Sequence, residues 1–171
     1  MKWLAVVGTR EATEEMQRDI SERVQAAVRD GWGIVTGGST GVDTVAIMVA
    51  MQCGGTVRIY LPIALDDYAT NLRERAQLGK CRAEDAALTI DALRELKMSN
   101  PQAVFEPAHT GELTPAAFYA RNELVLQTAD MVAAYHLEGN TTASVLRAGT
   151  LLTVDRAHEI DLPVELHQYY V

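Results

Sequence analysis

The sequence predicts an α/β protein in which helices cover both faces of a mainly parallel β-sheet. Short apolar segments rich in Val and Ile alternate along the chain with longer segments of helical periodicity. Glycine-rich turns connect several of the apolar segments to the helix that follows. The 171 residues can enclose one core, and 48% of them are hydrophobic, as in globular domains. We therefore expect a Rossmann-like, three-layer α/β/α fold.

The first third of the chain predicts three strands separated by two helices. The strands are expected at 2–8, 32–36 and 56–61, and the helices at 13–30 and 41–52. In the first helix, Met16, Ile20 and Val24 share one face, and Thr13 is a suitable N-cap. The second helix is apolar on nearly all sides, which predicts that it is buried.

The remainder of the chain continues the alternation less regularly. Helices are expected at 68–78, 83–97, 114–129 and 142–156, with strands within 103–107 and at 131–135 and 162–166. Thr114 followed by Pro115 is a typical helix start. The region of about 64–113 departs from the strand–helix order. It predicts a helical insertion within a single domain spanning 1–171.

Composition and charge narrow the range of partners. The net charge is −8, and the chain contains two Trp, six Tyr and two Phe. Because nucleic-acid binding depends on basic groups and stacking aromatics, this composition argues against a nucleic-acid partner. Cys53 and Cys81 follow no metal or redox spacing, and the histidines form no ligand motif, so no metal site is predicted. Without a signal or membrane-spanning segment in the sequence, we expect a cytoplasmic protein that makes no membrane contact.

Three strand ends carry glycine together with short polar side chains. Ligands of open α/β sheets lie beyond the carboxyl ends of the strands, and helix N-termini attract phosphate. Strand-to-helix turns also favour Gly, Ser and Thr for backbone reasons alone, which is the alternative interpretation. The spacing matches neither the dinucleotide fingerprint nor a P-loop. The turn residues predicted to bind a ligand are Gly8, Thr9, Arg10, Gly37, Gly38, Ser39, Thr40, Gly41, Gly139, Asn140 and Thr141.

Several segments resemble the Rossmann-like domain of DNA-processing protein A (DprA/Smf) and the related LOG proteins, which together form the SLOG superfamily. They are VVGTR near the start, GWGIVTGGSTGVDTVA, and the Arg121-Asn122 pair within FYARNELVL. YATNL at 68–72 resembles the Tyr-Pro stretch of DprA, with Ala69 in place of proline. The resemblance covers most of the chain and is weakest at about 73–113.

The resemblance implies a binding site for a nucleotide or nucleotide-derived ligand built on these turns. It adds Arg121 and Asn122 to the predicted site. The Arg121 guanidinium suits phosphate geometry, and Asn122 is unfavourable in mid-helix unless it has a specific role. The ligand itself stays open, since relatives include nucleotide-binding enzymes, a carrier of molybdenum cofactor and DprA, which holds single-stranded DNA. Relatives commonly pair, so a homo-oligomer, most simply a dimer, is expected.

Two alternatives to a simple nucleotide-binding module follow from the same resemblance. LOG proteins are nucleoside 5′-monophosphate phosphoribohydrolases, with Arg121 as the matching catalytic arginine if this chain is an enzyme. LOG proteins carry a Pro-Gly-Gly-x-Gly-Thr-x-x-Glu stretch, which reads YHLEGNTTASV in this chain. The position of its catalytic glutamate falls near Ala143 or Ser144, neither of which has a carboxylate. Glu123 and Glu138 are the candidate substitutes. The second alternative is single-stranded DNA binding of the DprA type.

Overall fold

The computed structural model describes residues 1–108, 111–139 and 149–171, and it contains a six-stranded parallel sheet with strand order β4-β3-β2-β1-β5-β6. Every neighbouring pair of strands is parallel. The predicted Rossmann-like α/β fold is thereby confirmed. The strands are β1 (Trp3–Gly8), β2 (Gly33–Thr36), β3 (Val57–Tyr60), β4 (Val104–Phe105), β5 (Met131–Glu138) and β6 (Val164–Tyr170).

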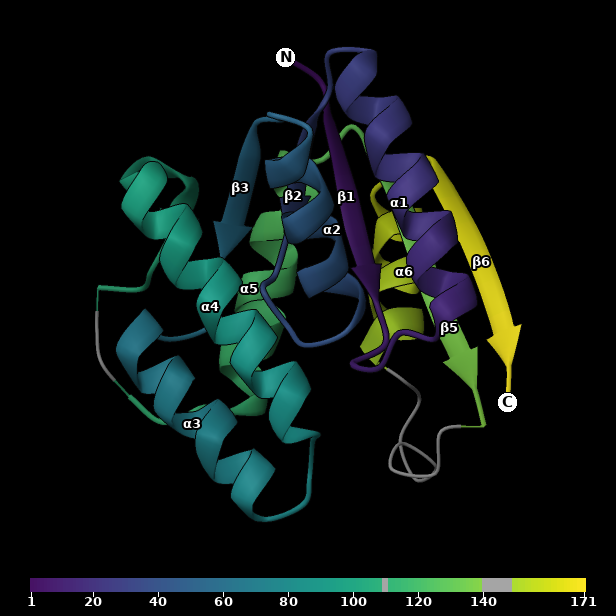
Figure 1. The fold of residues 1–171 in the computed structure, drawn as a ribbon. Coiled ribbons are helices and arrows are strands. Elements are labelled where there is room, and N and C mark those ends of the chain that lie inside the picture. Colours follow the sequence, from purple (N-terminus) through teal and green to yellow (C-terminus); the bar gives the residue numbers. More distant parts are fainter. Residues whose placement is uncertain (109–110, 140–148) are drawn as a thin grey trace.

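Helices cover both faces of the sheet. In Figure 1, α1 and α2 lie in front of the sheet and α5 and α6 behind it, while α4 lies beside β3 and α3 lies past the end of that strand. The helices are α1 (Glu14–Arg29), α2 (Val42–Gln52), α3 (Leu65–Gln77), α4 (Ala83–Ser99), α5 (Pro115–Thr128) and α6 (Gly149–Glu159), with a 3-10 turn at Pro101–Ala103. Within the described residues, no helix is both long and apolar enough to cross a membrane.

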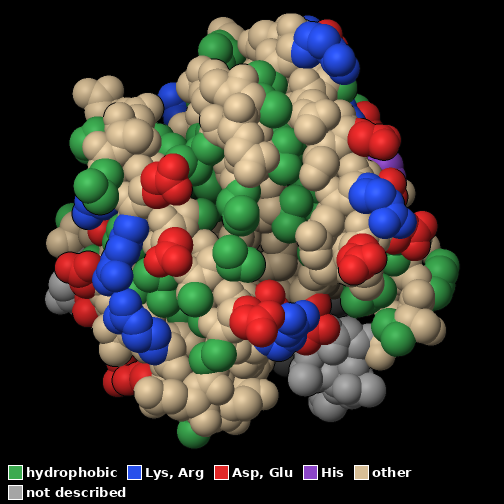
Figure 2. Space-filling view, viewed as in Figure 1, with side chains coloured by type: hydrophobic (Ala, Val, Ile, Leu, Met, Phe, Trp, Pro, Cys, Tyr) green, Lys and Arg blue, Asp and Glu red, His purple; other side chains and the backbone are tan. Residues whose placement is uncertain are grey.

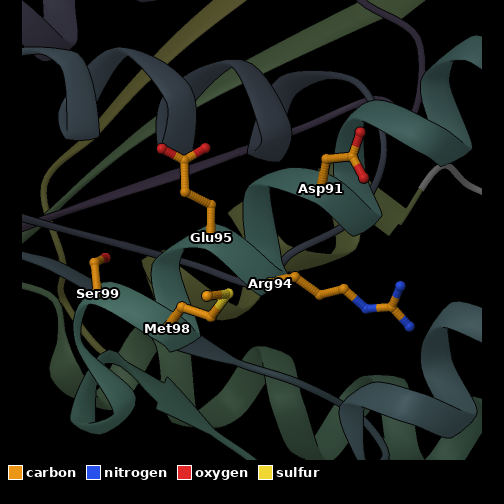
Figure 3. Close-up of a pocket in the computed structure, with 5 residues that line it drawn as sticks. All are labelled: Asp91, Arg94, Glu95, Met98 and Ser99. Carbon is orange, nitrogen blue, oxygen red and sulfur yellow. The ribbon is translucent and has the colours of Figure 1, made fainter.

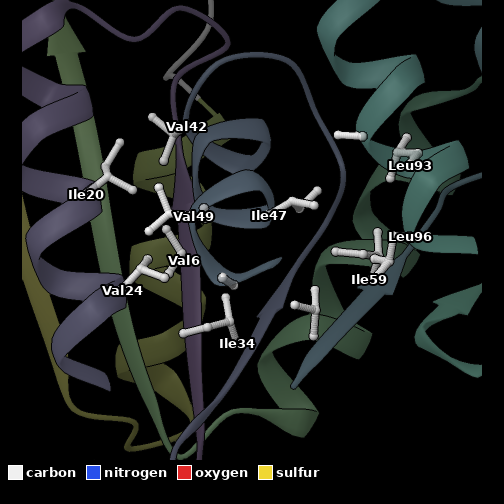
Figure 4. Packing of buried hydrophobic residues seen from close by; sticks show 14 of the residues in the cluster. Val6, Ile20, Val24, Ile34, Val42, Ile47, Val49, Ile59, Leu93 and Leu96 are labelled. Carbon is white, nitrogen blue, oxygen red and sulfur yellow. The ribbon is translucent and has the colours of Figure 1, made fainter. Parts of the chain in front are cut away.

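Two apolar clusters hold the layers together. The larger one packs α1, α2 and α4 against one face of the sheet (Figure 4), where Ile20, Ile34, Ile47 and Leu93 are fully buried. The smaller cluster joins the other face to α5 and α6 through Val35, Leu126, Val132 and Val154 among others. As its all-round apolar sequence predicts, α2 is buried, between α1 and α4.

Helix α3 begins three residues earlier than the periodicity predicts. Its first residue is Leu65, whose backbone N–H donates to Glu106 Oε1 at 2.7 Å. Asp66 and Asp67 follow in the first turn, where negative charge complements the helix dipole. The long-range contact from Glu106 therefore supplies a helix start that the local sequence does not show.

The two C-terminal strands are displaced relative to the prediction. β5 runs to Glu138 instead of 135, because its pairing with β6 continues in register until Glu138 faces Tyr170. Helix α6 extends to Glu159 and ends where Asp161 adopts a positive φ of 59°, so that β6 starts at Val164 and not at 162. The predicted start of this helix, at 142, lies outside the described residues.

The strand order places a ligand crevice at a defined position. β1 pairs with β2 on one side and with β5 on the other, and the chain crosses to opposite faces of the sheet in the two halves. The carboxyl ends of these strands point to the bottom of Figure 1, and α3 lies past the end of β3. Ligands of doubly wound sheets bind where the strand order reverses, at this edge.

Candidate functional site

The turns after β1 and β2 are bonded to each other and to β5. The Thr9 N–H donates to the Tyr135 carbonyl, and the Thr9 carbonyl accepts from the Val42 N–H, both at 3.1 Å. Gly41 adopts a φ of 77°, and a Cβ there would lie 2.5 Å from the Arg10 carbonyl oxygen and 2.6 Å from that of Thr9. Only glycine allows this approach, so the two turns form one unit at the crevice.

Within the glycine-rich turn, several backbone groups already have partners inside the protein. The Ser39 N–H donates to Asp43 Oδ2 at 3.1 Å, and the Tyr68 hydroxyl donates to the Gly38 carbonyl at 3.0 Å. The Thr44 hydroxyl donates to the Ser39 carbonyl at 2.8 Å. Asp43 therefore complements the positive end of α2 and also organises the turn that precedes the helix.

Arg121 reaches this turn from the opposite face of the sheet. Its Nη1 donates to the Gly37 carbonyl and its Nη2 to Ser39 Oγ at 3.4 Å. Its Nε donates to Asn122 Oδ1 at 2.9 Å, so the mid-helix Asn122 fixes the direction of the guanidinium. Arg121 is only 5% exposed. Through these bonds Arg121 holds the glycine-rich turn in place and brings a buried positive charge next to it.

Burial and charge shift the pKa values of two acidic groups at this turn. Burial raises the pKa of the Asp43 carboxyl, and the Arg121 charge and the Ser39 backbone amide oppose that rise. Burial also raises the pKa of the Tyr68 phenol, so Tyr68 remains a hydrogen-bond donor near neutral pH. The turn is thus a closely packed polar network around one carboxyl group.

A narrow pocket opens in front of the turn. Its enclosed volume is about 10 Å³, and its walls come from the β1 turn, the glycine-rich turn, α3 and α5. The Phe118 ring lies 5.2 Å from the Arg10 guanidinium and 5.4 Å from that of Arg121, so it contributes cation–π contacts to both. The lining residues are Arg10, Ser39, Thr40, Tyr68, Asn71, Leu72, Arg75, Cys81, Leu113 and Phe118.

Positive charge gathers at this pocket. Burial of the Arg10 guanidinium, followed by repulsion from Arg75 and Arg121, lowers the pKa of Arg10, while Asp43 and Tyr68 act in part against these effects. Arg10 keeps an exposed edge at the mouth of the pocket. The guanidinium groups of Arg10, Arg75 and Arg121 therefore lie near the glycine-rich turn and near the buried carboxyl group of Asp43, in the first turn of α2.

The structure brings most of the predicted site residues together. The β1 turn, the glycine-rich turn, Arg121 and Asn122 form one continuous site. Gly139 ends β5 with a φ of 85°, and its nearest side chain is that of Val171, on the β6 side. Asn140 and Thr141 lie outside the described residues.

Glu123 on α5 and Glu138 at the end of β5, the two candidate substitutes for the LOG-type carboxylate, each already contact another side chain. Glu123 binds Arg156 at 2.8 Å, and this contact lowers the pKa of Glu123. Glu138 lies 2.8 Å from Nε2 of His136, whose side chain is buried at the end of β5. Ala143 and Ser144, where a LOG-type carboxylate would fall, are outside the described ranges.

Sequence reasoning did not assign Tyr68, Asn71, Arg75 or Phe118 to the site. A signal for the first three is present, since Asn71 and Arg75 are four residues apart and Tyr68 is three residues before Asn71, which places all three on one helix face. Their approach to the turn depends on where α3 packs, which the sequence of the helix alone does not specify.

A second depression lies away from this edge of the sheet. Figure 3 shows that its lining residues, Asp91, Arg94, Glu95, Met98 and Ser99, all come from α4. The depression has a volume of about 540 Å³ but is open, and its polar groups do not converge. On the face of the molecule in Figure 2, acidic and basic side chains alternate without a continuous area of either sign. The convergent polar groups are those at the glycine-rich turn.

Comparison with known proteins identifies related folds. The sequence profile of DNA recombination-mediator protein A matches residues 1–168. DNA-processing protein A from Helicobacter pylori, whose structure was described for its single-stranded DNA binding mode, is 22% identical with a TM-score of 0.69 and covers 96% of this chain. The Streptococcus pneumoniae protein is 20% identical, with a TM-score of 0.65 and 97% coverage. The molybdenum cofactor binding protein from Rippkaea orientalis is 19% identical, with a TM-score of 0.60, and the match covers 98% of this chain and 76% of that protein.

The expectation that nucleic acid is not a partner is wrong. It rested on the net charge of −8 and the few aromatic residues. It is contradicted by the match to the recombination-mediator family and by the similarity to a protein whose structure was described for its single-stranded DNA binding mode. The physical reason is that the net charge is a sum over the whole surface, whereas the binding of a nucleic-acid strand depends on the charge at the binding site. Here the side chains of Arg10, Arg75 and Arg121 lie close to one another.

The comparisons also define the extent of the similarity. This chain spans 64% of the Helicobacter protein and 50% of the Streptococcus protein. None of the curated proteins compared with it gives a significant match. The profile match nevertheless covers nearly the whole chain, together with the Rossmann-like sheet and the glycine-rich turns described above. The chain belongs to the DNA recombination-mediator protein A family.

Proposed function

We propose that this chain binds single-stranded DNA, with backbone phosphates held at the carboxyl edge of the sheet. The observation that carries the proposal is the convergence of Arg10, Arg75 and Arg121 at the glycine-rich turn of a chain that is acidic as a whole. Guanidinium groups suit phosphate oxygens in both charge and geometry. An anionic ligand would relieve the repulsion among them.

Membership of the recombination-mediator family supports this ligand over the others that the resemblance allows. The structural similarity to the Helicobacter protein covers 96% of this chain, and that protein is described for its single-stranded DNA binding mode, which agrees with the proposal. This chain corresponds to 64% of the length of that protein. That this part alone binds single-stranded DNA is therefore part of the proposal.

The experiment is fluorescence anisotropy with a labelled oligothymidylate at several salt concentrations. We expect binding that weakens as salt rises, since each phosphate contact releases counterions. Arg10→Ala should weaken binding strongly, while Arg18→Ala, which removes the same charge from an exposed position on α1, should have little effect. Absence of binding at low salt, or equal effects of the two variants, would refute the proposal.

A small nucleotide-derived ligand is the second candidate. The pocket in front of the turn is narrow and partly enclosed by α3, a feature that suits one small group, and the similar Rippkaea protein binds molybdenum cofactor. Thermal-shift measurements with AMP, NAD, ADP-ribose and a pterin would identify such a ligand. Release of free base from AMP would point to a phosphoribohydrolase, with Arg121 as its arginine.

The organisation of the chain completes the proposal. We propose that residues 1–171 act as one domain, in which the helical insertion of about 64–113 supplies one wall of the site. We also propose a cytoplasmic homodimer. Light scattering coupled to size-exclusion chromatography tests the dimer, since a monomer mass at all protein concentrations would contradict it.

A further inference from the structure

One arginine and three aromatic side chains form a surface on the face of the sheet that α5 and α6 cover, away from the glycine-rich turn. They are Trp3 on β1, Arg58 and Tyr60 on β3, and Phe105 on β4. We propose that this aromatic–arginine surface binds a segment of a partner protein that carries a carboxylate next to an apolar side chain. The inference goes beyond strand binding and does not depend on it.

The four side chains share one face of the sheet. Trp3 and Tyr60 pack against the apolar cluster that joins the sheet to α5 and α6. Arg58 is two residues before Tyr60 in β3 and therefore points to the same face. The Phe105 ring stacks on that of Tyr60, with the ring centroids 4.9 Å apart. Because Trp3 is the first residue of β1, the surface extends toward the amino ends of the strands, whereas the glycine-rich turn lies at their carboxyl ends.

Part of this surface is open to a partner. On this face α5 packs against β1, β2 and β3, while α4 contacts β4. The side chain of Val104 belongs to the larger apolar cluster on the α4 side, so the next residue, Phe105, points the other way and is 42% exposed. Trp, Tyr and Arg are the residue types that contribute most to binding at protein interfaces. The composition of this surface is therefore that of a protein-binding site.

Arg58 supplies the charge of the surface. Its guanidinium carbon lies 4.5 Å from the centroid of the Trp3 ring and 5.5 Å from that of Phe105. Cation–π contacts use the face of a guanidinium and leave its in-plane N–H groups for acceptors. Within the part of the chain that the structure describes, Arg58 forms no ion pair and donates no hydrogen bond. Its planar fork matches a carboxylate, which gives the charge of the partner.

The stacking arrangement favours a protein segment over a nucleic-acid strand. The Trp3 ring packs directly on Gly33, where a Cβ would lie 2.5 Å from two ring carbons, and Arg58 lies over the same ring. Proteins that bind single strands stack successive bases on separate rings and follow the backbone with several cations. This surface has one cation, and the Asp130 carboxylate lies beside it, accepting from the Trp3 N–H at 2.8 Å. One carboxylate suits this charge pattern, whereas a row of phosphates would meet repulsion from Asp130.

A second copy of the chain suits the surface less well. In a two-fold interface the same surface faces itself, so Arg58 of one copy would lie near the rings and the Arg58 of the other. The carboxylate nearest to the rings, that of Asp130, is already bonded to the backbone of Trp3. A segment of a different protein can bring a free carboxylate to Arg58 and an apolar side chain to Phe105 at the same time.

The probe is a random heptapeptide library displayed on phage and selected on the immobilised chain. We expect the selected peptides to share an Asp or Glu next to an aromatic or aliphatic residue. A synthetic peptide of the shared sequence is then compared, by NMR titration of isotope-labelled protein, with a counterpart in which Asn or Gln replaces the acid. The Trp3 indole signal should shift only with the acidic peptide. Trp32 is the internal control, because it packs against the cluster on the opposite face.

Variants assign the binding to this surface. Arg58→Gln should weaken binding of the acidic peptide about tenfold, as for one charge-assisted hydrogen bond. Arg58→Lys should weaken it nearly as much, because lysine keeps the charge but not the planar fork. Phe105→Ala should also weaken it, since it removes the exposed ring. Arg18→Gln, which removes an exposed charge from α1, should stay within about twofold of the wild type. Thermal unfolding of each variant verifies that it is folded.

Each other outcome overturns the inference. Failure to recover a peptide whose binding depends on Arg58, or a shared sequence without an acid, would refute it. If Arg58→Gln weakens oligothymidylate binding as strongly as Arg10→Ala does, the surface belongs to a nucleic-acid strand. If Arg58→Gln is a monomer in light scattering while the wild type is a dimer, the surface belongs to a second copy.

Failure of the proposed function gives a different result. If the wild-type chain binds no oligothymidylate but binds the acidic peptide through Arg58, strand binding is refuted and the aromatic–arginine surface stands. If oligothymidylate binding depends on Arg10 and no peptide depends on Arg58, the reverse holds.

Discussion

Replacing Gly41 with alanine tests whether the two glycine turns form one rigid unit. The residue has a φ of 77° and a ψ of −122°, a backbone conformation that alanine adopts only with strain. Its Cβ would lie 2.5 Å from the Arg10 carbonyl oxygen and 2.6 Å from that of Thr9. These are backbone atoms, so the clash is relieved only if the turns move apart.

The magnitude follows from two contributions. An unfavourable backbone conformation costs about 1–3 kcal/mol, and overpacking against neighbours that cannot rotate away costs about 1–3 kcal/mol more. The expected loss in the free energy of unfolding is therefore about 2–6 kcal/mol. For a domain of this size each kcal/mol lowers Tm by about 2–4 °C, so Gly41→Ala should lower Tm by at least about 4 °C.

Gly54→Ala is the matched control. Gly54 also has a positive φ, of 68°, but a Cβ there would meet nothing within 4 Å. Its cost should be the backbone term alone, about 1–2 kcal/mol. Urea unfolding of both variants, followed by circular dichroism, measures the difference. If Gly41→Ala is no less stable than Gly54→Ala, the reasoning about the close approach of the two turns is wrong.

Three further predictions concern the same network and its supports. Arg121→Ala should destabilise the protein by about 3–5 kcal/mol because it leaves the buried Asp43 without its cationic partner. Arg156→Ala, which removes an exposed ion pair with Glu123, should change stability little. Urea unfolding measures both. Because the pKa of Asp43 is raised in the folded state, its stabilising contribution is complete below the unfolded pKa of 3.8 and is lost as pH rises through the folded pKa. The free energy of unfolding of the wild type should therefore fall relative to that of Asp43→Asn as pH rises above the unfolded pKa of 3.8, and equal pH profiles would contradict the assignment. Thr13→Ala should cost about 1 kcal/mol in the same assay, since the Thr13 hydroxyl caps α1 by accepting from the Met16 N–H, while Thr70→Ala, at an exposed position within α3, should cost less.

The fold could be predicted from the sequence because its local signals agree with its global order. The apolar segment around Ile34 is followed by the glycine-rich turn, the one around Ile59 lies between Gly55 and Pro62, and the largely apolar stretch at 41–52 indicated a buried helix. The limits of β6 could not be predicted, since they depend on its register with β5, which extends to the pair Glu138 and Tyr170. The start of α3 likewise depends on Glu106, which is 41 residues away from Leu65 in the chain.

The site was predictable in its position but not in its detailed contacts. The glycine turns and Arg121 could be identified from the sequence, because turn chemistry is local and the resemblance covers these motifs. The partners of Asp43 could not, since its carboxylate lies against the preceding turn only after α2 has packed. Arg75 was overlooked for a related reason. A single arginine on a polar helix resembles any solvated residue until the tertiary fold brings it to the pocket that Arg10 also lines.

The bond between the β1 turn and the start of α2 has a consequence for the thermodynamics of binding. The Val42 N–H and the Thr9 carbonyl are already joined without a ligand, and the Thr9 N–H is bonded to Tyr135. Binding therefore does not have to order these turns, and the conformational entropy that a disordered loop would lose has already been lost on folding. We expect calorimetry to show little of the heat-capacity change that accompanies coupled folding and binding. In hydrogen exchange, the Thr9 and Val42 amides should be protected to a similar extent in the free and bound protein.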